Sequence, residues 1–183
     1  MEKFTKLGWD RAFKKEGKIF VKPHRDMVRI AKFFKKEGIR KILDLGCGSG
    51  RHLVYLAKRG FDAYGIDIAR HGIKIARDWL KKERLKANLE IGDIYKKLPY
   101  KDNFFDAIIG IKTLHHEKIE NIRKLIKEVK RILKPGGLIF ITGHRKPPKK
   151  ENSKRKIIRN KIYRSKNLCN LSWSRKGDAS LYF

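Results

Sequence analysis

The stretch from Lys41 to Ala69 reads KILDLGCGSGRHLVYLAKRGFDAYGIDIA. Its apolar start breaks into three alternating glycines, Gly46, Gly48 and Gly50, and an acid, Asp67, follows further along. Glycine loses more conformational freedom on folding than any other residue. A cluster of glycines between a predicted strand and a predicted helix therefore indicates a loop whose backbone approaches a ligand closely.

Strand-like and helix-like segments alternate on both sides of this loop. Short apolar runs predict strands at 41–45, 62–67, 88–93, 104–111 and 138–143. Helical periodicity predicts helices at 51–60, at 69–86 and from 118 until Pro135 and two glycines stop it. This alternation predicts an α/β fold: a Rossmann-like, doubly wound, mostly parallel sheet with flanking helices. The nearly continuous apolar strands agree, because such a sheet is covered on both faces.

The chain divides into three parts by pattern. Residues 1–40 form an N-terminal helical segment, with an amphipathic helix over 24–38, and residues 41–143 form the Rossmann-like domain. Residues 144–183 hold thirteen Lys or Arg against two acids and show no clear period, which predicts a flexible basic tail.

The composition leaves two interpretations of the charge open. The chain has 48 Lys and Arg against 19 Asp and Glu, a formal net charge of +29. Such an excess could concentrate a nucleic acid at the surface. It could equally be the Lys- and Glu-rich composition of a thermophile, and the absence of glutamine fits that style.

Targeting and metal signals are weak throughout. No apolar stretch is long enough to cross a bilayer and the first residues lack a secretory apolar core, so we expect a cytoplasmic protein. Cys47 and Cys169 are far apart in sequence, and no disulfide is expected. The six histidines show no metal-ligand spacing, so no metal is predicted.

The glycine spacing excludes two familiar nucleotide loops. A dinucleotide fingerprint needs a third glycine where this chain has Arg51, counting from Gly46, or Leu53, counting from Gly48. A phosphate-binding P-loop needs a Gly-Lys-Ser/Thr ending that is absent here. A dehydrogenase is therefore disfavoured.

Several motifs within 41–143 resemble those of class I S-adenosylmethionine-dependent methyltransferases. They are LDLGCGSG, YGIDIA, IGDI, LKPGG and, after the fourth strand, IKTLHH. The last motif makes the type 11 methyltransferase domains the subgroup that the chain resembles most. The resemblance implies S-adenosyl-L-methionine as the cofactor.

The resemblance also implies which residues hold that cofactor. S-adenosylmethionine carries no phosphate but has an ammonium, a sulfonium and ribose hydroxyls, so its site needs acids more than arginines. Asp44 is implied to lie near the methionine amino group, Asp67 to bind both ribose hydroxyls, and Asp93 to bind the adenine amino group. The other implied cofactor residues are Gly46, Cys47, Gly48 and Gly50 in the loop, and Ile68 and Ile94 against the adenine. Taken singly, Asp67 could be a strand-end cap and Asp93 a turn residue.

Two further features have both a functional and a structural interpretation. His115 and His116 follow the fourth strand, where the methyl acceptor should lie, so either could be a general base. Alternatively, one packs against the cofactor loop and the other is solvated. Near the N-terminus Trp9, Phe13 and Phe20 belong to a segment that the resemblance places over the cofactor as a lid; the alternative is simple packing on the domain.

The pattern of the family breaks after residue 143. Family members continue with a helix and an antiparallel hairpin that complete a seven-stranded sheet, whereas this chain continues with the basic tail. Three explanations stay open: a natural tail, a nucleic-acid-binding extension, or a truncated or frameshifted gene product. We expect the fifth strand to be an unpaired edge.

The sequence thus predicts a methyltransferase that acts on an unidentified acceptor. A small-molecule acceptor is preferred, because the basic residues are spread along helices and no RNA-binding module is visible. Methylation of RNA, such as tRNA, is the alternative, and a non-catalytic cofactor-binding domain is a third. The oligomeric state is not predicted.

Overall fold

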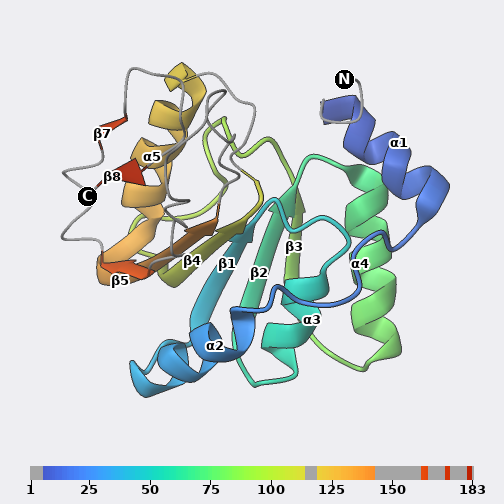
Figure 1. Ribbon diagram of the computed structural model, residues 1–183, viewed down its shortest axis with the longest axis horizontal. Helices are drawn as coiled ribbons and strands as arrows, with labels where there is room; N and C mark the ends of the chain where they lie inside the picture. The colour runs from blue at the N-terminus through green and yellow to red at the C-terminus, as the bar shows by residue number, and fades with distance from the viewer. Residues whose placement is uncertain (1–5, 114–118, 143–161, 165–171, 174–180, 183) are drawn as a thin grey trace, which may run out of the picture.

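The computed structural model describes residues 6–113, 119–142, 162–164, 172–173 and 181–182 (Figure 1). Five helices lie in this part of the chain: α1 (Lys6–Glu16), α2 (Met27–Lys36), α3 (Arg51–Ala57), α4 (Arg70–Lys82) and α5 (Ile119–Ile132). The longer strands are β1 (Lys41–Leu45), β2 (Asp62–Asp67), β3 (Asn88–Ile91), β4 (Phe105–Ile111) and β5 (Leu133–Thr142). Three short ones follow: β6 (Ile162–Arg164), β7 (Ser172–Trp173) and β8 (Leu181–Tyr182).

The main sheet has the order β3-β2-β1-β4-β5-β6, and the first five strands are parallel. The order reverses direction at β1, whose Leu43 pairs with Tyr64 of β2 on one side and Ile108 of β4 on the other. Ligands of open α/β sheets bind at the carboxyl ends of the strands beside such a reversal. The predicted α/β, Rossmann-like fold is therefore confirmed.

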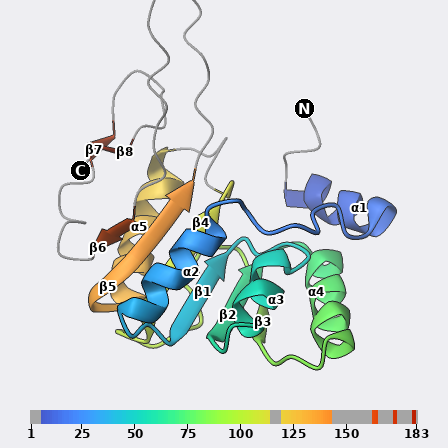
Figure 2. The same ribbon diagram turned by 60° about the horizontal axis from the view of Figure 1, so that its bottom comes forward.

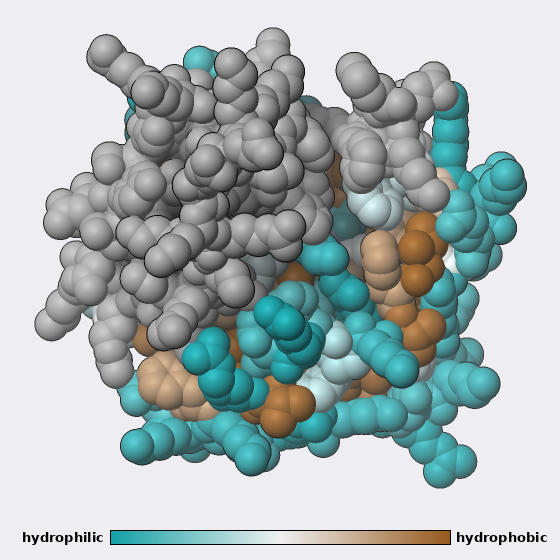
Figure 3. All heavy atoms as spheres, viewed as in Figure 1, coloured by the Kyte–Doolittle hydropathy of each residue, from teal (hydrophilic) through white to brown (hydrophobic). Residues whose placement is uncertain are grey.

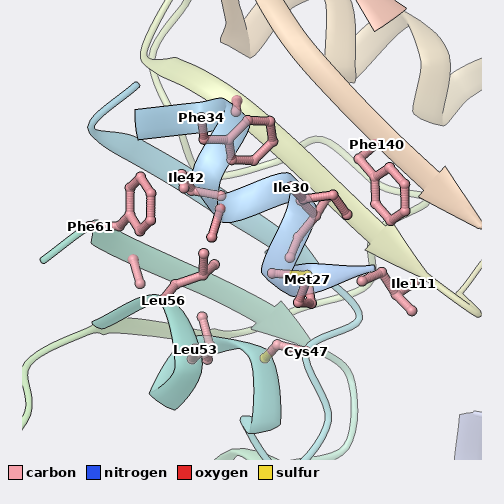
Figure 4. Close-up of a cluster of buried hydrophobic side chains, with 14 of the residues drawn as sticks. Met27, Ile30, Phe34, Ile42, Cys47, Leu53, Leu56, Phe61, Ile111 and Phe140 are labelled. Atoms are coloured by element: carbon pink, nitrogen blue, oxygen red, sulfur yellow. The ribbon is translucent and has the colours of Figure 1, made fainter. Parts of the chain in front are cut away.

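Helices cover both faces of the sheet (Figure 2). On one face α2, α3 and α4 bury a core against the strands, and Figure 4 shows it around Met27, Phe34, Leu53 and Phe140. On the other face α5 and the chain that follows β3 bury a second core, which includes Leu125. Adjacent residues of β1 pack into different cores, because side chains alternate between the two faces of the sheet along a strand.

The N-terminal amphipathic pattern forms α2 as expected. Met27, Ile30 and Phe34 recur at helical spacing and are completely buried. Gly38 follows in the left-handed conformation at φ +68°, where glycine commonly ends a helix. The helix begins and ends inside the predicted range.

The start of β5 differs from the prediction. LKPGG was expected to form a turn between the helix and the strand, but β5 already begins at Leu133 and contains it. The pairing with β4 shifts register between Phe105 and Ala107, whose partners are Leu133 and Leu138. This bulge absorbs the extra residues and lets Pro135 sit in the strand without breaking the ladder.

The outer edge of β5 is paired, which differs from the prediction. Sequence patterning predicted no strand after residue 143 and an unpaired fifth strand, yet β6 pairs antiparallel with β5, with Phe140 opposite Ile162 and Leu138 opposite Arg164. β7 and β8 form a separate antiparallel pair. A strand as short as β6 gives no periodic signal in the sequence, and its pairing depends on the edge that β5 provides. Flexibility of 144–183 stays a prediction.

Candidate cofactor site

The candidate site lies where β1, β2 and β3 end, on the same edge of the sheet. The glycine loop, residues 46–50, joins β1 to α3, while Asp67 ends β2 and Asp93 follows β3. Because these strands are parallel and adjacent, their carboxyl ends converge. The structure therefore brings together the acids that the resemblance implied to hold the cofactor.

The glycine loop is held by backbone bonds in a conformation that suits glycine. The N–H groups of Gly46 and Cys47 both donate to the carbonyl of Ile66, at 2.8 and 3.2 Å. Gly46, Gly48 and Gly50 have φ angles of +70°, +54° and +85°. Side chains other than glycine rarely adopt this region, so the three glycines are required by the path of the loop.

Neighbours also exclude side chains from the loop. A Cβ atom on Gly46 would collide with Thr113 Cγ2, and one on Gly50 would lie 2.7 Å from the Cβ of Ala76. Thr113 is fixed there because its Oγ1 donates to the carbonyl of Leu45 at 2.8 Å. Thr113, which follows β4, thus packs against the glycine loop. No sequence pattern predicted this contact.

Asp67 ties the glycine loop to the end of β2. Its Oδ2 accepts a hydrogen bond from the Gly48 N–H at 2.7 Å, and its Oδ1 accepts one from Ala69 at 2.8 Å. Its main-chain carbonyl accepts from the N–H of Gly92, beyond β3. Burial raises the pKa of Asp67, although the hydrogen bonds from Ala69 and Gly48 oppose the shift. The carboxylate therefore lies beside the glycine loop and is partly shielded from water.

Asp44 is more deeply buried, with 1% of its surface exposed. Its Oδ2 lies 3.3 Å from Nδ1 of His52, but the geometry is not that of a hydrogen bond, and Oδ2 has no hydrogen-bond partner among the residues that the structure describes. Buried polar atoms are nearly always paired. An orphaned carboxylate oxygen beside a glycine loop fits a site that receives a cationic or hydrogen-bonding ligand.

The residues implied to hold the adenine occupy the expected side of the site. Asp93 follows β3, and its Oδ1 accepts a hydrogen bond from the Tyr95 N–H at 3.0 Å, which folds the loop after the strand. Ile94 is nearly buried, at 8% exposure, and Ile68 is half-buried. The Asp93 turn is thus real, while its role toward a ligand stays a prediction.

The side chain of Cys47 is packed in the protein interior. It is a free, buried thiol, and its Sγ would lie 2.8 Å from a Cβ built on Gly65. Burial raises its pKa well above the ordinary value, so the thiol stays protonated and unreactive. If Cys47 contacts a cofactor, only its main chain can do so.

Helix α1 lies against the glycine loop and the start of α4. The ring of Phe13 lies 3.0 Å from the position of a Cβ on Gly48, and also 3.0 Å from that of a Cβ on Gly72. Trp9 packs beside Phe13 and Phe20, with ring centroids 6.0 and 6.3 Å away. Phe13 therefore covers the glycine loop at Gly48, and Trp9 packs behind it.

A bidentate contact fixes α1 to α4. The Asp10 carboxylate accepts a hydrogen bond from the main-chain N–H of His71 at 2.8 Å and lies 2.8 Å from its Nδ1. The N–H of His71 has no partner within its own helix, since it belongs to the first turn, so Asp10 caps α4 from a distance. Burial would raise the pKa of Asp10, but the hydrogen bonds from His71 outweigh it and lower that pKa.

Two predicted residues lie outside the described part of the chain. They are His115 and His116, the candidate general bases. Among the residues that the structure describes, no group of three or more His, Cys, Asp or Glu could hold a metal ion. No helix in those same ranges is long and apolar enough to span a membrane.

His52 is the residue that sequence reasoning missed. It is 3% exposed, stands in the first turn of α3 and lies between Asp44 and the main chain of His24. One feature of the sequence could have pointed to His52: it is a polar residue on the buried face of a helix whose other buried residues are apolar. A metal-ligand spacing search does not detect such a residue.

The strand order, the flanking helices and the loop after β1 place the protein in the class of Rossmann-like α/β proteins. The chain belongs to a family of methyltransferase domains, whose family model matches residues 43–141. The resemblance noted from the motifs is thus confirmed.

Known proteins similar to this chain differ in acceptor. One is the tRNA (carboxymethyluridine(34)-5-O)-methyltransferase of Arabidopsis thaliana, 38% identical over 130 residues, which are 67% of this chain and 30% of that protein. Another is the norajmaline N-methyltransferase of Rauvolfia serpentina, 33% identical over 108 residues, 57% of this chain and 36% of that protein. The chain therefore spans about a third of the length of these curated relatives.

A solved structure agrees with the family. The crystal structure of a SAM-dependent methyltransferase from Methanosarcina mazei matches with a TM-score of 0.52 and 32% identity, over 55% of this chain and 50% of that one. The match extends the agreement from sequence motifs to the fold.

Proposed function

We propose that this protein binds S-adenosyl-L-methionine at the carboxyl ends of β1, β2 and β3 and transfers its methyl group to an acceptor. The observation that carries the proposal is the pair of buried or half-buried carboxylates, Asp44 and Asp67, on either side of a loop that only glycine can form. The membership of a methyltransferase family supports it.

The residues present fit this cofactor and not a dinucleotide. Asp44 offers a buried oxygen that is unpaired among the described residues, which suits an ammonium group, and Asp67 is only half-buried, so hydroxyl groups could approach its oxygens. A pyrophosphate would instead bring negative charge toward two carboxylates, which electrostatics disfavours. These two hydrogen-bond acceptors thus favour a ligand with a cationic group and hydroxyls.

The roles follow from position. Asp44 would bind the amino group of the methionine part, Asp67 the ribose hydroxyls and Asp93 the adenine amino group. Ile68 and Ile94 would pack against the adenine ring, and Gly46, Gly48 and Gly50, with the Cys47 main chain, give the backbone clearance. Phe13 and Trp9 on α1 would exclude water from this side.

The bound cofactor would supply an electrophilic methyl group on a sulfonium. The protein's own contribution would be mainly orientation, because holding reactants in line can provide most of the rate. A general base is needed only if the acceptor must lose a proton. Assignment of that role to His115 or His116 stays a prediction.

Calorimetric titration tests the cofactor directly. We expect S-adenosylmethionine and S-adenosylhomocysteine to bind and NADH not to bind. Binding of NADH in the absence of binding by either adenosyl compound would overturn the proposal. Binding of both adenosyl compounds with no methyl transfer to any acceptor would indicate the non-catalytic alternative.

We favour a small molecule as the acceptor. Exposed Lys and Arg occur on α2, on α4 and on α5, and α5 covers the opposite face of the sheet from the other two. In Figure 3 hydrophilic side chains lie mainly along the lower and right margins of the described surface, with apolar side chains between them. A nucleic-acid footprint would gather on a single face.

RNA is the second candidate, and two observations favour it. The net charge of +29 is large, and one relative is a tRNA methyltransferase. Binding of total tRNA across a salt series separates the two acceptors, because contacts with several phosphates make affinity fall steeply with salt. Methyl transfer from labelled cofactor into tRNA, with none into a metabolite extract, would reverse our preference.

A further inference from the structure

Two cationic residues, Arg51 and Lys112, border the glycine loop. Arg51 follows Gly50 directly, at the start of α3. Lys112 follows β4 and precedes Thr113, the residue that packs against Gly46. Both cations therefore stand at the edge of the candidate cofactor site.

The guanidinium of Arg51 is half-buried and has no carboxylate bonded to it in the described part of the chain. It donates to the carbonyl of Lys22 at 3.4 Å and lies 4.9 Å from the centroid of the Phe20 ring. Burial lowers its pKa, although the charge of Asp44 opposes the shift. None of the ion pairs between described residues includes Arg51. A partly dehydrated cation without a bonded anion is costly, and an anionic ligand would offset that cost.

Lys112 has a backbone conformation that is uncommon for its residue type. Its φ is +58°, and its N–H donates to the carbonyl and to Oγ1 of Thr142, at 3.2 and 3.0 Å. Left-handed backbone in a residue other than glycine stores strain, which proteins concentrate at functional sites. Ile111, the residue before it, belongs to the same buried core as Met27 at the start of α2 (Figure 4). The fold thus keeps an exposed lysine, which forms no ion pair with any described residue, in a strained position near the start of α2.

His24 shows that the charges of Arg51 and Lys112 act on one place. Its main-chain N–H donates to Nε2 of His52, the neighbour of Arg51, at 3.3 Å. Burial lowers the pKa of the His24 ring, and the positive charges of Arg51 and Lys112 lower it further, against the effect of Asp26. The two cations and the His24 ring therefore form one electropositive cluster beside the glycine loop.

We propose that Arg51 and Lys112 bind an anionic group of the methyl acceptor, which is therefore a small acid, such as a carboxylic acid. The inference rests on the proposed function and adds the chemical class of the acceptor. A guanidinium binds a carboxylate through two parallel hydrogen bonds, and an ammonium group adds a second charge. The carboxylate of the methionine part of the cofactor is the other source of such an anion, and the experiment separates the two sources.

Acetate is the probe, because it is small enough to enter a subsite without the rest of an acceptor, and acetamide is its neutral control. Both are titrated into the protein saturated with S-adenosylhomocysteine, at an ionic strength kept constant with chloride. ¹H–¹⁵N spectra follow the amide groups and the histidine rings. We expect acetate, and not acetamide, to shift the amide signals of Arg51 and Lys112 and to raise the pKa of His24, because a bound anion offsets the two positive charges.

Variants of the two cations test whether this binding belongs to the cluster. Arg51→Gln and Lys112→Gln should each weaken acetate binding on the order of tenfold, and S-adenosylhomocysteine binding by less than about twofold. Lys130→Gln, an exposed change on α5, should alter neither affinity. Lys112→Gln also keeps the inference testable if Arg51→Gln does not fold, since the Lys112 side chain is exposed.

Three results count against the proposals, and they are distinguishable. Acetate that shifts no signal of the cluster, or that binds both variants as well as the wild type, would overturn the inference. A loss of S-adenosylhomocysteine affinity in Arg51→Gln, with 5′-methylthioadenosine unaffected, would overturn it too, because only the first ligand has the amino acid part. A wild type that binds neither adenosyl compound would refute the proposed function, whatever the result with acetate.

Methyl transfer gives a second readout. A metabolite extract is separated into anionic, neutral and cationic fractions before reaction with labelled S-adenosylmethionine. We expect label to enter the anionic fraction, and Lys112→Gln to raise the KM for that fraction with little change in kcat. Label in the neutral or cationic fraction alone would contradict the inference.

Discussion

The Asp67 carboxylate accepts a 2.7 Å hydrogen bond from the main-chain N–H of Gly48, so the acid at the end of β2 and the centre of the glycine loop form one unit. The second oxygen accepts from Ala69, just before α4. One side chain therefore fixes the loop after β1 relative to the turn after β2. Loss of that side chain should affect both the loop and any ligand that lies against it.

We expect Asp67→Ala to weaken binding of S-adenosylmethionine by roughly 10- to 100-fold, because bonds to a charged acceptor contribute about 1.5–3 kcal/mol each. The ribose is common to the adenosyl ligands, so binding of S-adenosylhomocysteine should be weakened too. Calorimetry provides both values, and Asp78→Ala, an exposed position on α4, is the control. Unchanged affinity in Asp67→Ala would remove this residue from the site.

Gly48→Ala should disrupt the loop more than an ordinary glycine substitution. Its φ of +54° costs alanine about 1–2 kcal/mol, and the new Cβ would also lie 3.0 Å from the Phe13 ring. Gly60→Ala is the matched control, since Gly60 has φ +78° with nothing within 4 Å of the Cβ position.

Urea unfolding and cofactor titration distinguish the two glycine variants. Both should lose stability through the backbone, but only Gly48→Ala should also lose cofactor affinity. Equal affinity in the two variants would show that the loop at Gly48 does not contact the cofactor.

The Asp10–His71 contact provides a test of α1 as a cover for the site. In Asp10→Ala the first turn of α4 loses its acceptor, and α1 loses its only bidentate contact among the hydrogen bonds found for the described residues. We expect faster amide hydrogen exchange in α1 and several-fold weaker cofactor binding. Lys14→Ala, an exposed change on the same helix, should alter neither. Weaker binding without faster exchange would argue against a cover that is held by this contact.

Much of the fold was predictable because its signals are local. The apolar runs of β1 and β2 and the periodic spacing around Ile30 and Phe34 each specify an element without information from distant residues. The start of β5 was not predictable, since a proline and two glycines normally end regular structure, and only the register shift opposite Phe105 accommodates them. The pairing of β6 depends on an edge that the rest of the fold creates.

The site was predictable in its residue types and not in its contacts. Asp44 and Asp67 could be selected from the motifs that resemble those of methyltransferases, but the bond from Gly48 to Asp67 depends on how the loop turns. Asp10 and His71 are 61 positions apart, so no local pattern joins them. His52 was overlooked because its significance comes from the main chain of His24, which contributes no side-chain signal.

The last prediction concerns Glu128 and Arg131 on α5, which fasten the chain that follows β3. Glu128 accepts from the Arg131 side chain at 2.7 and 3.1 Å and from the Leu98 N–H at 2.8 Å, while Arg131 donates to the carbonyls of Tyr100 and Leu98. The hydrogen bonds from Arg131 lower the pKa of Glu128 below its ordinary value of 4.5, against the opposing effect of burial.

Because its folded-state pKa is lowered, Glu128 contributes stability that is fully present above pH 4.5 and is lost as the pH falls through the folded value. We therefore expect Glu128→Gln to lower the free energy of unfolding by about 1–2 kcal/mol at neutral pH, with the difference from the wild type shrinking in acid. Urea unfolding at pH 7 and at several lower pH values measures this difference. Glu90→Gln, an exposed change on β3, should cost less than about 0.5 kcal/mol at neutral pH. If Glu128→Gln lowered the free energy of unfolding by the same amount at low pH as at pH 7, the shape of the side chain, and not its charge, would hold this segment.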